Sequence, residues 1–340
     1  MKCEVNRICF LLFFWSVILN AHAPFAWEKT DYIWNFGLRY DCDVGVNTEP
    51  EEYFSTLEFP YKRENYLSIK ENDLVWIRPS FLKRFYEDFI EGLDKKIVLV
   101  VCDGDESFPK DCGLTPTELE NLLSSPFIQH VFTQNYDYRG PSKKVSPIPI
   151  GIDFHSIAFK GGRWGEKGSP KEQQQFLQDL LATSLPTRKR KIKAFVDFQH
   201  SESMRASFQR YKDFDEDRLE IFQKIIKSNV VEFSKKLDRS ALWKKKCEYA
   251  FSISPWGNGL DCHRTWEDLA LGCIVIVKTS SLDPLYSGLP VVIVNDWDEI
   301  DDENLEKWFH LFQDASENLS YREKITNTYW FNKILAARAV

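Results

Sequence analysis

Residues 249–277 read YAFSISPWGNGLDCHRTWEDLALGCIVIV and decide the fold, because they predict a strand, a loop with two glycines, a helix and a second strand in direct succession. The first strand is expected to end before Pro255, which has no N–H group for a sheet hydrogen bond. Gly257 and Gly259 let the backbone turn tightly and approach a ligand closely. Such a βαβ unit normally binds its ligand beyond the carboxyl end of the first strand.

The helix of this unit is expected to begin near Cys262, with Asp261 placed to cap it. Apolar residues recur at helical spacing, which predicts one buried face made of Trp266, Leu269, Ala270 and Cys273. Gly272 is expected to end the helix. The apolar, β-branched run at residues 274–277 is typical of a parallel strand that is covered on both sides.

The charged residues of this helix fit a phosphorylated ligand that also carries hydroxyl groups. His263, Arg264 and Glu267 are expected on the face opposite the apolar one, directed towards the glycine loop. Free N–H groups at a helix start attract phosphate, and a guanidinium group can bind two phosphate oxygens at once. A carboxylate one turn later can accept hydrogen bonds from sugar hydroxyls. A nucleotide sugar, that is, a sugar linked to UDP or GDP, offers both the phosphates and the hydroxyl groups.

The same stretch resembles the donor-binding segment of the exostosin-like glycosyltransferases. The similarity lies in four features: a glycine loop, an Arg, a Glu five residues before a Gly, and a buried strand. The matching residues are Gly257-Asn258-Gly259, Asp261, His263-Arg264-Thr265-Trp266-Glu267 and Gly272-Cys273-Ile274-Val275. It is specific over residues 251–296 and weaker over residues 191–205. The resemblance implies an inverting enzyme of the GT-B type, an α/β fold with two Rossmann-like domains facing a cleft.

The resemblance also implies roles for individual residues. Glu267 would bind the nucleotide ribose, and Arg205 would lie near the donor diphosphate. No cofactor is required beyond the nucleotide-sugar donor. Residue chemistry and resemblance together predict the donor-binding residues Arg205, Ser254, Asn258, Gly259, Asp261, His263, Arg264 and Glu267.

Simpler interpretations of the same residues remain open. The two glycines can serve only a tight turn. Arg264 and Asp268 can form an ordinary surface pair at i, i+4, and Glu267 can be a solvated charge. Cys262, His263 and Glu267 have metal-binding side chains, but no second ligand pair such as Cys-x-x-Cys accompanies them, so no metal site is predicted.

Alternating strand and helix patterns divide the chain into domains. Strands are expected at residues 74–77, 97–102, 128–133 and 145–150, and helices at 304–312 and 322–337. The predicted domains are an N-terminal acceptor-side α/β domain at residues 24–158, a linker and helix at 159–185, a C-terminal nucleotide-sugar-binding α/β domain at 186–315, and a helix at 316–340 that can cross back to the first domain.

An inverting transfer needs a base for the acceptor's proton and positive groups for the departing diphosphate. Arg264 and Arg205 can supply the positive groups without a metal. Asp103 and Asp105 follow a strand, and the Asp153/His155 pair lies at the linker, so these four are the candidates for the base. The acceptor is expected to be a glycan or another hydroxyl group, free, lipid-linked or protein-linked.

Two other functions stay open. Asp103-Gly104-Asp105 can be the metal and diphosphate clamp of a single-domain, metal-dependent GT-A transferase. The chain can also be a catalytically inactive secreted protein that binds glycans on the same scaffold. The net charge of −7, with 51 acidic against 44 basic residues, lacks the positive excess that nucleic-acid binding needs.

The N-terminus has the three-part form of a secretory signal peptide within residues 1–23, with an apolar run at 8–19 and a cleavage signal at Ala21-His22-Ala23. Pro24 is a poor residue after such a site, so an uncleaved membrane anchor stays open. Both readings place the body in the secretory lumen (endoplasmic reticulum or Golgi), the cell envelope or the exterior. Cysteines can pair in such compartments, and Cys102 with Cys112 is the first pair to test.

Overall fold

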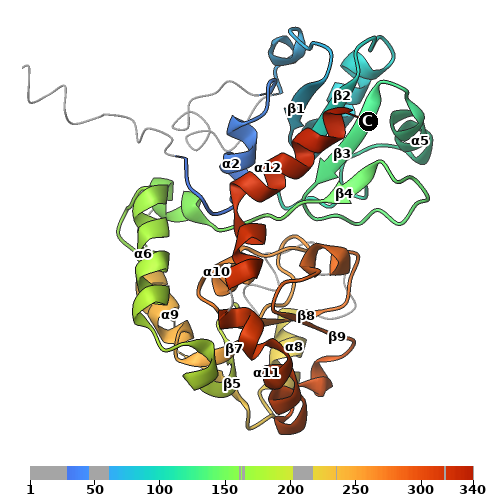
Figure 1. The fold of residues 1–340 in the computed structure, drawn as a ribbon. Helices are drawn as coiled ribbons and strands as arrows, with labels where there is room; N and C mark the ends of the chain where they lie inside the picture. The colour runs from blue at the N-terminus through green and yellow to red at the C-terminus, as the bar shows by residue number, and fades with distance from the viewer. Residues whose placement is uncertain are drawn as a thin grey trace, which may run out of the picture.

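The computed structural model describes residues 29–45, 61–160, 162, 165–201, 217–234, 236–317 and 319–339. Within these ranges the chain forms two halves, each built on a parallel sheet (Figure 1). The N-terminal half holds strands in the order β1-β2-β3-β4, and the C-terminal half in the order β6-β5-β7-β8-β9. The predicted α/β fold with two Rossmann-like domains is confirmed. The predicted signal peptide or anchor at residues 1–23 and Arg205 lie outside the described residues.

The N-terminal half follows the sequence pattern closely. Its strands are β1 (Asp73–Ile77), β2 (Ile97–Val101), β3 (Ile128–Thr133) and β4 (Val145–Pro147), and its helices are α2 (Asn35–Tyr40), α4 (Leu82–Phe85) and α5 (Pro116–Ser124). All of β2 is buried, as its continuous apolar run predicts. Strand β4 is shorter than expected, because Pro147 and Pro149 have no N–H groups for the sheet.

The C-terminal half contains the predicted βαβ unit. Its strands are β5 (Lys191–Val196), β6 (Val231–Phe233), β7 (Tyr249–Ile253), β8 (Ile274–Lys278) and β9 (Val291–Val294), and its helices are α8 (Arg218–Ile225), α9 (Arg239–Lys246), α10 (His263–Ala270) and α11 (Asp302–Glu317). Strand β8 pairs in parallel with β7 and β9. Gly272 has a φ of 78° and ends α10, and the predicted apolar face of this helix is fully buried.

The C-terminal segment differs from the single helix that was expected at residues 322–337. A 3-10 helix (Leu319–Ile325) comes first, and Thr326 then caps α12 (Asn327–Ala336) by accepting a hydrogen bond of 3.2 Å from the Tyr329 N–H. Helix α12 lies against the N-terminal half, next to α2 (Figure 1). Beyond α12, the carbonyl of Arg338 accepts a hydrogen bond from Gln129 on β3, at 3.1 Å.

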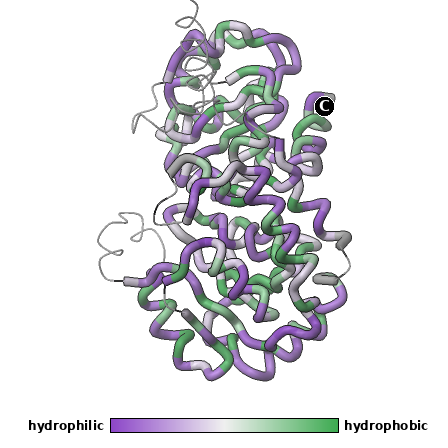
Figure 2. Tube along the Cα trace, turned by 90° about the vertical axis from the view of Figure 1, so that its left-hand side faces the viewer, coloured by the Kyte–Doolittle hydropathy of each residue, from purple (hydrophilic) through white to green (hydrophobic). Residues whose placement is uncertain are grey.

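The apolar core is continuous between the halves. Each sheet has a cluster of its own, and the largest cluster joins side chains of both halves, among them Trp34, Trp76, Trp266 and Trp330. Figure 2 shows hydrophobic segments running through the middle of each half. Helix α6 (Pro170–Thr183) connects the two halves and packs on α9 and α10.

Cys102 and Cys112, the first pair to test for a disulfide, are not bonded to each other, and the six cysteines that the structure describes are all free. The thiol of Cys102 instead accepts a hydrogen bond from the Trp76 indole at 3.2 Å, and Cys112 packs in the core of the N-terminal half. Among the described residues no helix is both long and apolar enough to span a bilayer.

Candidate functional site

The carboxyl ends of the two parallel sheets meet at the junction between the halves. Asp105, in the loop after β2, accepts a hydrogen bond of 3.1 Å from Asn258, in the loop after β7. Tyr136, in the loop after β3, accepts one of 2.7 Å at its carbonyl from Ser281, which follows β8. Because ligands of open α/β sheets bind beyond the carboxyl ends of the strands, this junction is where both halves can present residues to a ligand.

Asp261 fastens the glycine loop to the N-terminal half and does not cap α10. Its carboxylate accepts hydrogen bonds from the backbone N–H of Ile150 at 2.8 Å and from the Trp266 indole at 2.9 Å. Its own N–H donates to Asn135 at 2.9 Å. The N-cap of α10 is Cys262, whose side chain makes no capping hydrogen bond, so the predicted capping role is wrong. Burial raises the pKa of Asp261 to about 6, despite these hydrogen bonds.

The two loop glycines make room for protein side chains. Neither has a positive φ. A Cβ atom on Gly257 would lie 2.8 Å from Nη2 of Arg218, and one on Gly259 would lie 2.6 Å from the Asn135 side chain. Packing within the junction therefore requires Gly259, whereas the flexible end of Arg218 can move away from a Cβ on Gly257. A contact between Gly259 and a donor stays a prediction.

Arg264 belongs to a buried network of four charged side chains. Its Nε lies 2.5 Å from Asp197, at the carboxyl end of β5, and Lys246 bridges Asp197 and Asp268 at 2.8 and 2.6 Å. Ser252 donates a further hydrogen bond to Asp268. The surface pair between Arg264 and Asp268 that the spacing allowed is therefore wrong, because Asp268 is completely buried.

The charges of this network shift one another's pKa values. Burial alone would raise the pKa of Asp197, but Arg264 and Lys246 outweigh it and hold this pKa at about 2. Burial raises the pKa of Asp268 to about 6, although Lys246 opposes the shift. Nη1 of Arg264, at the start of α10, is buried without a hydrogen-bond partner from the described residues.

Glu267 is held by two side chains of α9 that sequence reasoning missed. The indole of Trp243 donates to its Oε2 at 3.1 Å, and Nη1 of Arg239 lies 3.5 Å from its Oε1. With 6% of its surface exposed, Glu267 is not the solvated charge of the simpler interpretation. Arg239, Trp243 and the network's Lys246 are spaced at i, i+4 and i+7, so they share one face of α9, and this spacing could have identified them.

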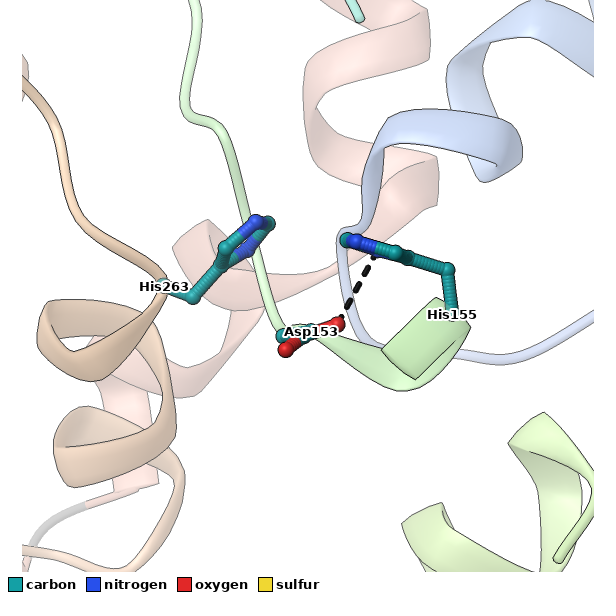
Figure 3. A group of neighbouring side chains, drawn as sticks. All are labelled: Asp153, His155 and His263. Carbon is teal, nitrogen blue, oxygen red and sulfur yellow. Dashed lines mark ion pairs between the residues drawn. The ribbon is translucent and has the colours of Figure 1, made fainter. Parts of the chain in front are cut away.

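Asp153, His155 and His263 come together at the junction (Figure 3). Nδ1 of His155 lies 3.0 Å from Oδ1 of Asp153, and the rings of the two histidines are 5.4 Å apart between centroids. Arg239 holds Oδ2 of Asp153 at 2.7 Å. The structure therefore joins two candidates for the base to one predicted donor-binding residue, a contact that sequence spacing does not reveal.

The surroundings of this group set its protonation. Burial by itself would raise the pKa of Asp153, but His155 and Arg239 outweigh it and hold this pKa well below its usual range. Burial lowers the pKa of His155, and the carboxylate of Asp153 only partly opposes this shift. The group therefore combines an ionised carboxylate with an imidazole that favours its neutral form.

The other predicted site residues lie nearby in different environments. Ser254 is buried, with its hydroxyl 2.9 Å from that of Thr265. The carboxylate of Asp103 faces Arg78 at 3.5 Å, whereas Asp105 is bound to Asn258.

The two aspartates of the metal-clamp alternative, Asp103 and Asp105, have separate partners in the structure, Arg78 and Asn258. In the part of the chain that the structure describes, neither aspartate belongs to a group of three or more His, Cys, Asp or Glu side chains close enough to share an ion. Two separate parallel sheets also differ from the single-domain fold of the GT-A alternative, which is wrong in this respect.

Comparisons with known proteins give remote structural similarities. No family model and no curated protein matches the chain. A UDP-forming α,α-trehalose-phosphate synthase from Burkholderia xenovorans is 14% identical, with 82% of this chain and 80% of that chain covered and a TM-score of 0.38. An α1,3-fucosyltransferase is 12% identical, with 78% and 75% covered and a TM-score of 0.33. At such identities and scores these similarities carry no assignment of function.

Proposed function

We propose that this protein is a glycosyltransferase that moves a sugar from a UDP- or GDP-linked donor to a hydroxyl group of a glycan, lipid-linked or protein-linked acceptor. The observation that carries the proposal is the meeting of the carboxyl ends of both parallel sheets at one junction. A transfer between two substrates needs two binding sites that face each other, and each sheet presents its ligand-binding edge to the other. In this proposal residues 186–315 hold the donor and residues 24–158 hold the acceptor.

The start of α10 is the donor side of the proposed site. Its N–H groups suit a diphosphate, and so does Nη1 of Arg264, which has no hydrogen-bond partner in the part of the chain that the structure describes. Asp197 fixes the guanidinium from its other edge. The remaining predicted donor contacts, Ser254, Asn258 and His263, lie in or next to the same loop. Glu267 would reach a ribose hydroxyl only in competition with Trp243 and Arg239, which occupy its two oxygens.

The acceptor side supplies the base. Of the four candidates, Asp103 is paired with Arg78 and Asp105 with Asn258. His155 is instead oriented by Asp153, which Arg239 fixes in turn. We therefore assign His155 as the base that takes the proton from the acceptor hydroxyl, with Asp153 as its orienting partner. The proposed reaction is inverting and needs no metal. The resemblance in residues 251–296 makes an exostosin-like enzyme the favoured subtype, and residues 1–23 favour the secretory pathway or the cell envelope.

The proposal is tested by screening UDP- and GDP-sugars for thermal stabilisation of the protein and for release of the nucleotide. We expect at least one donor to stabilise the protein and to be turned over in the presence of a chelator. His155→Ala should lower turnover by about 10²–10⁴-fold, whereas His310→Ala, on the exposed face of α11, should leave it unchanged. Binding without turnover would favour the catalytically inactive glycan-binding alternative, and no binding of any donor would overturn the proposal.

A further inference from the structure

We propose that Asp153, His155 and His263 bind one divalent transition-metal ion, of the class of Zn²⁺ or Co²⁺, at the junction of the two halves. One ligand atom of each residue lies within 4.8 Å of the other two, and Figure 3 shows the two imidazole rings on either side of the carboxylate. Within the described residues this is the only group of three or more His, Cys, Asp or Glu side chains that meets this spacing.

The donor atoms suit such an ion. Two imidazole nitrogens and one carboxylate oxygen form a ligand set that first-row transition metals accept, with further positions left to water or a ligand. Zn²⁺ holds these atoms at about 2.0–2.2 Å. The side chain of His155 is 21% exposed, so its ring can turn towards the other two ligand atoms.

Contacts around the group already orient two of the three ligands. His263 donates from Nδ1 to the carbonyl of Gly151 at 2.7 Å, because a carbonyl oxygen can only accept. The lone pair of the neutral ring is therefore on Nε2, and a histidine held in this way is typical of metal sites. Asp153 is fixed at Oδ2 by Arg239 at 2.7 Å and accepts a hydrogen bond at Oδ1 from the Ser156 N–H at 2.9 Å.

The local charge is compatible with a cation, although Arg239 is close. Arg239 contributes one positive charge, while Asp153 and the neighbouring Glu267 contribute one negative charge each. With neutral imidazoles the group therefore carries a formal charge of −1, so that a divalent ion is attracted overall. Arg239 is also directed to the carboxylate oxygen Oδ2 and to the backbone carbonyl of Asp153, which leaves Oδ1 on the side of His155.

A metal at this position would join the two halves, since Asp153 and His155 follow β4 whereas His263 begins α10. One consequence rests on the proposed function. A ring nitrogen of His155 that binds a metal cannot accept a proton at the same time, so the ion would inhibit the transfer. A chelator would then raise the activity of a metal-loaded preparation.

The test measures metal binding without any assay of activity. Chelator-stripped protein is dialysed to equilibrium against Co²⁺ or Zn²⁺, and bound metal is counted per chain. We expect a single ion per chain and binding weakened by more than about tenfold in His155→Ala and in His263→Ala. His310→Ala, on exposed α11, and His130→Ala, on β3, are the controls and should bind like the wild type. Unchanged binding in both site variants would overturn the proposal.

Two further measurements distinguish this site from metal binding at the cysteines and from loss of folding in the variants. The Co²⁺ absorption spectrum should lack a thiolate-to-cobalt charge-transfer band; its presence would assign the ion to the free cysteines and overturn the proposal. If the site variants do not fold, histidine NMR of the wild-type protein decides. Among the 6 histidines of the chain, the signals of two imidazoles should shift with one equivalent of Zn²⁺, and the absence of such shifts would overturn the proposal.

Discussion

Replacing Lys246 by Met would remove the one cation that bridges the two buried carboxylates of the Arg264 network. Its Nζ lies 2.8 Å from Asp197 and 2.6 Å from Asp268, and the Lys246 side chain is fully buried. Both carboxylates raise the pKa of Lys246 against the opposing effect of burial, so the charged form is the stable one. Among the described residues, the variant leaves the buried Asp268 carboxylate with Ser252 as its one hydrogen-bond partner.

The expected cost of this change is large. Removing one partner of a buried ion pair costs about 3–5 kcal/mol, because the remaining charge stays desolvated. The matched control is Lys245→Met, at the preceding position of the same helix. Its Nζ pairs with Glu248 at 2.8 Å, with the two side chains 33% and 45% exposed. Such a surface pair contributes about 0–1 kcal/mol.

Urea unfolding followed by circular dichroism measures the two costs. The double variant Lys246→Met with Asp268→Asn should recover part of the lost free energy, since a neutral buried pair carries no desolvated charge. The reasoning is refuted if Lys246→Met lowers the free energy of unfolding no more than Lys245→Met does, or if the double variant is less stable than Lys246→Met alone.

Three further predictions concern the junction and the C-terminal helix. Gly259→Ala should destabilise the protein by about 1–3 kcal/mol through overpacking. Gly92→Ala should leave the stability unchanged, because the new Cβ would lie in open space, and thermal unfolding measures both variants. Trp266→Phe leaves Asp261 buried without its indole donor and should cost about 1–3 kcal/mol, and an unchanged unfolding midpoint in urea would contradict this. Thr326→Ala removes the cap of α12 and should cost about 1 kcal/mol, measured in the same way.

Local signals in the sequence were sufficient for most elements of the fold. Pro255 follows the end of β7, Gly272 adopts a positive φ after α10, and the sequence Thr115-Pro116-Thr117-Glu118 forms a capping box at the start of α5. Each of these depends on the conformation of a few neighbouring residues. Hydrophobic spacing likewise identified which face of α10 is buried, because burial of an apolar face requires no knowledge of what covers it.

The polar partners could not be predicted in the same way. Asp261 stands next to the helix start and has the chemistry of a cap, but its carboxylate binds Ile150 and Trp266. Nothing in the local sequence indicates that a backbone N–H of the other half would be 2.8 Å away. Similarly, the contact of His263 with Asp153 arises only when the two sheets meet, so each residue was assigned a separate role.

The central claim, that the start of α10 holds a nucleotide, is tested most directly by calorimetry of UDP and GDP with the wild type, Arg264→Ala and the surface control Lys307→Ala. Charge-assisted hydrogen bonds contribute about 1.5–3 kcal/mol. We therefore predict that one of the nucleotides binds the wild type and Lys307→Ala equally, and binds Arg264→Ala about 10–100-fold more weakly. Equal affinity for all three proteins, or no binding of either nucleotide to the wild type, would contradict the account.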